Sequence, residues 1–179
     1  MANDLLQRVT ELNEKARKSL GNNDPSGALA FFYDALELLA QSDQTAARAE
    51  ILNNIGHTIN SLGRSGEALT AFREAADLYA AAGDLAAYGW QLANIGSVMR
   101  DREDHAGAVE MYEQALAALT RAGNEMGRAD QFSNLGYSHA RAGNPEQARD
   151  CFRRALYIYE RLGEERKAAL ARRNLSALG

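Results

Sequence analysis

The sequence predicts an all-α protein, a solenoid of about four antiparallel helix hairpins followed by a C-terminal capping helix. Its 179 residues contain only two prolines among many Ala, Leu, Glu, Arg and Gln residues, which favour helices. Segments of the chain recur at an offset of 40 residues. Within each segment the apolar residues are spaced three and four positions apart, which is helical periodicity.

The repeat is clearest in three segments that align without a gap. They begin Leu52-Asn53-Asn54-Ile55-Gly56, Leu92-Ala93-Asn94-Ile95-Gly96 and Phe132-Ser133-Asn134-Leu135-Gly136. Small and aromatic residues recur further along, as Ala68/Ala108/Ala148, Phe72/Tyr112/Phe152 and Ala75/Ala115/Ala155. Because these positions recur together, each segment is interpreted as one supersecondary unit.

The expected order of elements follows from this alignment. A degenerate first copy spans about 10–49 and has Ala16 in place of the recurring glycine, and three regular copies span about 50–89, 90–129 and 130–169. The capping helix is expected at 170–179, and residues 1–179 are interpreted as a single domain.

Short breaks divide each copy into two helices. They contain Gly63-Arg64-Ser65-Gly66, Asp101-Arg102-Glu103-Asp104 and Ala142-Gly143-Asn144-Pro145. Proline suits the first turn of a helix, and glycine suits the left-handed residue that closes one. Each copy is therefore predicted to be a helical hairpin.

Recurring glycines predict how the helices pack. Gly56, Gly96 and Gly136 would each cost about 1 kcal/mol in a helix interior relative to alanine, so their shared register indicates a close helix approach. The aromatic residues of the second helices are expected to fill gaps between neighbouring hairpins. No hairpin buries such a face alone, so stability is expected to come from stacked neighbours.

These residues resemble the tetratricopeptide repeat, with aromatic or Leu-x-x-Ile/Leu-Gly followed by Ala, Phe/Tyr and Ala. The repeat of 40 residues is longer than the 34 residues common in this family. In this respect the sequence resembles the long-repeat subgroup that includes kinesin light chain and the Leu-Gly-Asn-rich adaptors. The resemblance implies a right-handed superhelical solenoid whose first helices line a concave groove. It also implies a non-catalytic scaffold or adaptor that binds a protein or peptide segment.

The resemblance places Asn54, Asn94 and Asn134 where such proteins hold a peptide backbone. An amide side chain can pair with both the C=O and the N–H of an extended peptide. The asparagines could instead cap local turns or face water, and Trp90 could pack on the preceding hairpin. The full set of candidate peptide-binding residues is Asn53, Asn54, His57, Trp90, Asn94, Ser97, Arg100, Asn134, Tyr137 and Arg141.

Several classes of function are disfavoured. A net charge of −4 argues against nucleic-acid binding, and no apolar run is long enough for membrane insertion. Fingerprints of nucleotide-binding, zinc-protease and hydrolase sites are absent, and the three histidines lack metal-ligand spacing. We therefore expect no enzyme activity, no cofactor and no metal. A single cysteine and no recognisable signal segment favour a cytoplasmic location.

The preferred hypothesis is an adaptor that holds a partner segment in its concave groove. The alternative is a peptide-sensing regulator or assembly factor, in which the ligand alters a second interaction. An uncapped terminal repeat would also allow copies of the chain to stack, so homo-oligomers through the terminal repeats fit either hypothesis.

Overall fold

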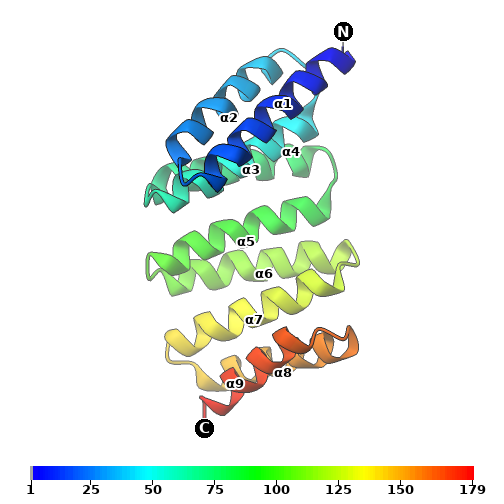
Figure 1. Cartoon of the computed structure of the whole chain (residues 1–179). Coiled ribbons are helices and arrows are strands. Elements are labelled where there is room, and N and C mark those ends of the chain that lie inside the picture. Colours follow the sequence, from blue (N-terminus) through cyan, green and yellow to red (C-terminus); the bar gives the residue numbers. More distant parts are fainter. Residues whose placement is uncertain (1) are drawn as a thin grey trace. The chain divides into compact units, whose positions relative to one another are not determined.

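The computed structural model describes residues 2–179, with side chains from residue 4 onward, and this part of the chain contains nine α-helices and no strand (Figure 1). The all-α prediction is confirmed. In chain order the helices are α1 (Ala2–Gly21), α2 (Pro25–Leu39), α3 (Thr45–Ser61), α4 (Ser65–Ala81), α5 (Leu85–Asp101), α6 (His105–Arg121), α7 (Glu125–Arg141), α8 (Pro145–Arg161) and α9 (Glu165–Ser176).

The helices form two compact units, which meet in the sequence at Asp84 and Leu85. In the first unit, α1 pairs with α2 and α3 with α4, and α2 packs on α3. In the second, α5 pairs with α6 and α7 with α8; α6 packs on α7, and α9 packs on α8. Neighbouring hairpins within each unit thus stack as a helical solenoid does.

The 40-residue period holds, but the helices begin earlier than the expected windows. First helices start at Thr45, Leu85, Glu125 and Glu165, where the windows start at 50, 90, 130 and 170. The expected ranges start just before the glycine-containing segments. The helices begin earlier because these segments lie in the middle of the first helices. The last helix, α9, accordingly spans Glu165–Ser176, and the first copy begins with α1 at Ala2.

Turn chemistry explains several helix boundaries. Asp24 and Asp104 cap α2 and α6 by accepting a hydrogen bond from the backbone N–H three residues later, at 2.8 and 2.9 Å. Pro145 is the first residue of α8, as predicted. Gly143 has a φ of 79°, the left-handed conformation expected of a residue that closes a helix. Glu103 has a φ of 65° at the equivalent place after α5, without the freedom of glycine.

The close helix approach predicted from the recurring glycines is confirmed. A Cβ atom on Gly56 would lie 2.6 Å from Cε1 of Phe72, and one on Gly136 would lie 2.8 Å from Cδ1 of Phe152. In the three regular repeats the aromatic ring of the second helix, Phe72, Tyr112 or Phe152, therefore lies directly over the glycine of its own hairpin. Tyr112 of α6 also reaches the next hairpin, since it packs in one cluster with Leu135 of α7.

A second glycine pair was not predicted. Leu119 of α6 is fully buried between Gly89 of α5 and Gly127 of α7. A Cβ on either glycine would come within 2.8 or 2.9 Å of the leucine side chain. Leu119 therefore joins α6 to both neighbouring first helices, α5 and α7, by fitting against a glycine on each.

Within the described residues, none of the helices combines the length and apolar character that crossing a membrane requires.

Candidate functional site

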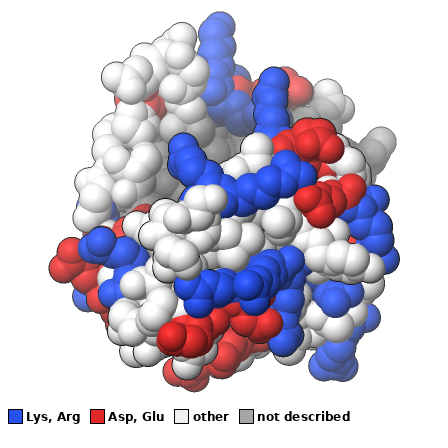
Figure 2. All heavy atoms as spheres, turned by 90° about the horizontal axis from the view of Figure 1, so that it is seen from below, with Lys and Arg blue, Asp and Glu red and all other residues white. Residues whose placement is uncertain are grey.

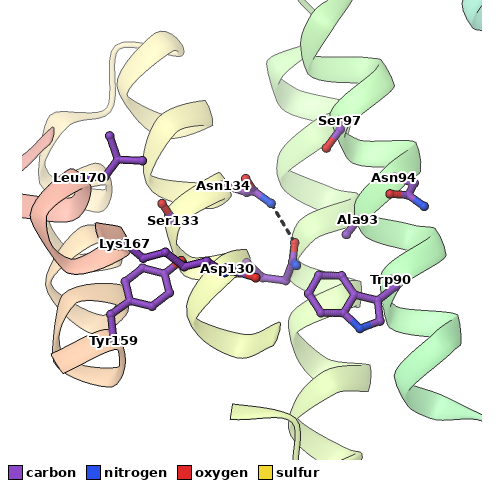
Figure 3. A pocket seen from close by; sticks show the side chains of 11 residues that line it. Trp90, Ala93, Asn94, Ser97, Asp130, Ser133, Asn134, Tyr159, Lys167 and Leu170 are labelled. Atoms are coloured by element: carbon purple, nitrogen blue, oxygen red, sulfur yellow. Dashed lines mark hydrogen bonds and ion pairs between the residues drawn. The ribbon is translucent and has the colours of Figure 1, made fainter. Parts of the chain in front are cut away.

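The candidate site is an open groove of about 380 Å³ in the second unit, formed mainly by the first helices α5 and α7 and by α9 (Figure 3). Four of the ten predicted binding residues line it, namely Trp90, Asn94, Ser97 and Asn134. The other lining residues include Asp130 and Ser133 of α7, Tyr159 of α8, and Lys167 and Leu170 of α9. First helices thus supply most of the groove.

Trp90 forms part of the apolar wall of the groove. Its indole is partly buried against a cluster of Leu92, Ala93 and Ala115 from its own hairpin, yet it still lines the open space. Leu170 of α9 is also in the lining and remains 44% exposed. The groove therefore offers apolar surface that a ligand could cover.

The groove asparagines are held by glutamines of their own helices. Asn134 donates from Nδ2 to Oε1 of Gln131 at 3.2 Å, drawn as the dashed line in Figure 3, and Asn94 bonds Gln91 at 3.5 Å. Gln131 is fully buried, and its own Nε2 has no hydrogen-bond partner. The pairing fixes the direction of the Asn134 amide and leaves its Oδ1 and second N–H for a ligand. Sequence reasoning foresaw the asparagines but not their supporting glutamines.

The three predicted residues of the first unit lie on α3, and two of them, Asn53 and Asn54, form a polar cluster with Asn13 of α1. Asn54 donates to Oδ1 of Asn13 at 3.3 Å, and Asn53 donates to Oδ1 of Asn54 at 3.4 Å. His57 packs edge-on against Phe72 with ring centroids 5.0 Å apart, and partial burial lowers its pKa. These asparagines thus link two helices within the protein.

Arg100 and Tyr137 lie beside one another at the end of α5 and α7. The Arg100 guanidinium stands over the Tyr137 ring at 5.7 Å and donates twice to Oδ1 of Asp101, at 3.0 and 2.8 Å. Tyr137 is 47% exposed, and Arg141 is exposed one turn further along α7. Arg100 therefore presents a charge that Asp101 partly neutralises.

A charged cluster in the groove was missed. Asp130 accepts hydrogen bonds at its Oδ1 from Lys167 at 2.6 Å and from the Tyr159 hydroxyl at 2.8 Å. Burial and the neighbouring carboxylate raise the pKa of Tyr159, so it stays a neutral donor. The sequence does contain one sign of this cluster. Lys167 is a charged residue at a repeat position where the other copies have the small residues Ala47, Ala87 and Gly127.

The described residues contain neither a metal-binding group nor an activated cysteine. They contain no group of three His, Cys, Asp or Glu side chains that could hold a metal ion. Burial raises the pKa of Cys151 to about 11, so its thiol is protonated and weakly nucleophilic near neutral pH.

Comparison with known proteins identifies the family. Two tetratricopeptide repeat models match residues 47–121 and 129–162, which together make up more than half of the chain. The chain belongs to the tetratricopeptide repeat family. No curated protein matches the sequence.

Solved structures share the fold of this tetratricopeptide repeat protein. BtubC (BKLC) from P. vanneervenii superposes with a TM-score of 0.81 at 16% identity, covering 97% of this chain and 82% of that one. Kinesin-light-chain-like repeats of Podospora anserina give 0.79 at 14% identity, covering 96% and 84%. Apo RapI gives 0.88 at 12% identity, and the match covers 97% of this chain but 48% of RapI. The predicted resemblance to kinesin light chain is thereby confirmed at the level of the fold.

Family membership supports a general role as a protein-interaction scaffold, and such scaffolds are typically non-catalytic.

Proposed function

We propose that this tetratricopeptide repeat protein is an adaptor that holds an extended segment of a partner protein in the groove of α5, α7 and α9. The observation that carries the proposal is the pair Asn94 and Asn134, which lines an open groove next to Trp90 and is held by glutamines. Oriented amides at a fixed spacing can pair with a peptide backbone whatever its side chains are.

Hydrogen bonds from the asparagines cannot supply the whole affinity. Two of them contribute a net ~2 kcal/mol, whereas micromolar binding needs about 8 kcal/mol. Burying Trp90 and Leu170 under an apolar ligand side chain supplies a further part, since covering a large side chain contributes about 1.5–3 kcal/mol. The preferred ligand therefore carries an apolar residue that reaches Trp90.

Charged side chains in the groove and beside it can also contribute to ligand binding. The carboxylate of Asp130 and the ammonium of Lys167 face the same space and already bind each other at 2.6 Å. Arg100 and Arg141, together with Tyr137, are proposed to contact an acidic ligand residue at the far end of α5 and α7. In the first unit, Asn53, Asn54 and His57 are proposed as a contact surface of their own.

Peptides selected from a random library against the purified protein would test the proposal. A selected, fluorescein-labelled peptide should bind the Asn94→Ala/Asn134→Ala variant about 5–150-fold more weakly than wild type, which corresponds to ~1–3 kcal/mol. The control is Glu110→Ala, an exposed residue of α6 outside the groove. Equal weakening in the control would contradict the assignment of the groove.

The sequence also left open a peptide-sensing regulator. That alternative requires the bound peptide to change a second interaction. If selected peptides bind the groove and also alter the self-association of the chain, the regulator becomes the better description.

A further inference from the structure

A second groove lies between α7 and α8 on other residues than the candidate site. It has a volume of about 430 Å³. Its lining consists of Phe132, Tyr157 and Ile158 together with Glu125, Arg128 and the α8 arginines Arg153, Arg154 and Arg161. On α7, Arg128 and Phe132 line the second groove. Asp130 and Asn134 line the first groove, and each lies two positions after one of them. Two positions correspond to about 200° around a helix, so α7 serves the two grooves with opposite faces.

The second groove is rich in arginine, and only part of that charge is neutralised. Arg161 pairs with Glu125, and Arg154 pairs with Asp150 at 2.9 Å while standing over the Phe132 ring at 5.6 Å. By contrast, Arg128 and Arg153 take part in no ion pair within residues 2–179, and the buried Nε of Arg128 has no hydrogen-bond partner.

The part of the chain that contains this groove also carries an excess of positive charge. Residues 125–179 contain ten Lys or Arg and seven Asp or Glu side chains, although the whole chain carries a net charge of −4. Figure 2 shows Lys and Arg side chains of the chain as bands with uncharged surface between them and Asp and Glu side chains beside them. Tyr157, in the lining of the groove, is 67% exposed and adds aromatic surface beside the arginines.

We infer that the α7–α8 groove binds an acidic segment of a partner protein. Its carboxylates pair with Arg128 and Arg153, and an aromatic residue of the same segment packs on Tyr157 and Phe132. The planar guanidinium group donates two parallel hydrogen bonds to a carboxylate, which suits an Asp- or Glu-rich peptide. Glu125 and Asp150 within the cluster repel a continuous phosphate backbone, so a peptide fits better than a nucleic acid.

This inference does not depend on the first groove, and the two can fail separately. The probe is a short fluorescein-labelled peptide rich in Asp and Glu with one Phe, and its partner probe has every acid replaced by the matching amide. Fluorescence anisotropy should show that wild type binds the acidic peptide and that binding weakens as NaCl rises from about 0.1 M to about 0.5 M. The amide peptide should bind at least tenfold more weakly.

Charge-matched variants locate the site. Arg128→Gln/Arg153→Gln should weaken binding of the acidic peptide by about tenfold or more, since charge-assisted bonds are lost. Arg166→Gln/Arg173→Gln removes the same charge from α9, outside the groove, and should change binding by less than about twofold. The Asn94→Ala/Asn134→Ala variant should bind the acidic peptide like wild type. Circular dichroism checks folding, and Arg153→Glu alone replaces the double variant if Arg128→Gln proves unfolded.

Four results would overturn the inference. They are no binding of the acidic peptide by wild type, equal binding of the amide peptide, equal loss in the α9 variant, and tighter binding of a single-stranded RNA oligomer of the same charge.

Discussion

The packing of glycines against aromatic rings predicts that replacing such a glycine with alanine lowers the free energy of unfolding. In Gly56→Ala the new Cβ would lie 2.6, 2.8 and 2.9 Å from three ring atoms of Phe72, where ordinary contacts are 3.4 Å or more. The ring is 1% exposed, so it can move only by displacing its neighbours. Overpacking of this kind costs about 1–3 kcal/mol, and the better helix propensity of alanine returns about 0.5–1 kcal/mol. We expect a net loss of about 1–2 kcal/mol.

The matched control is Gly66→Ala in α4 of the same unit. A Cβ at Gly66 meets no atom within 4 Å, so the propensity gain acts alone and stability should rise by up to about 1 kcal/mol. Urea unfolding followed by circular dichroism measures both free energies. The packing argument is refuted if Gly56→Ala is as stable as wild type or more stable. It is also refuted if Gly56→Ala costs as much in a Phe72→Leu background, where the clashing ring is absent, as it does in wild type.

Three further predictions concern single groups. Glu103→Gly should raise stability by about 1 kcal/mol, because Glu103 has a φ of 65°; an unchanged unfolding free energy would show that the residue is not strained. Tyr112→Phe should cost about 1 kcal/mol by removing the 3.1 Å bond between the tyrosine hydroxyl and Ser97; a gain in stability would contradict that bond. Since burial raises the pKa of Cys151 to about 11, iodoacetamide should alkylate it far more slowly than a free thiol at pH 8, and faster in urea; equal rates would contradict its burial.

The fold could be predicted from the sequence where close packing allows only a small residue at a position. The pair Gly56 and Phe72 recurs in the three regular copies, because a residue without a side chain leaves room for the ring. The helix starts were harder to predict. Asp104 gives a side-chain cap that can be recognised, whereas Gln44 and Arg64 precede α3 and α4 without a capping hydrogen bond.

The candidate site was predicted only in part. Repeat register places Asn94 and Asn134 on first helices, and the structure puts both in the groove lining. The position of a residue in the repeat does not show which hydrogen bonds its side chain makes to neighbouring side chains. Asn54 bonds a residue of α1, and Asp130 bonds a lysine 37 positions later in α9. Such pairs depend on which helices lie next to each other and on rotamers, and neither follows from a 40-residue period.

The most direct test of the proposed groove uses Trp90, the only tryptophan of the chain. Its fluorescence reports on the candidate groove alone, provided that the selected peptide contains no tryptophan. Titration with that peptide should change the emission of Trp90 saturably, with the same Kd that anisotropy gives, and the Asn94→Ala/Asn134→Ala variant should require about 5–150-fold more peptide. Binding that anisotropy detects while Trp90 emission stays constant would contradict the account and move the binding surface elsewhere.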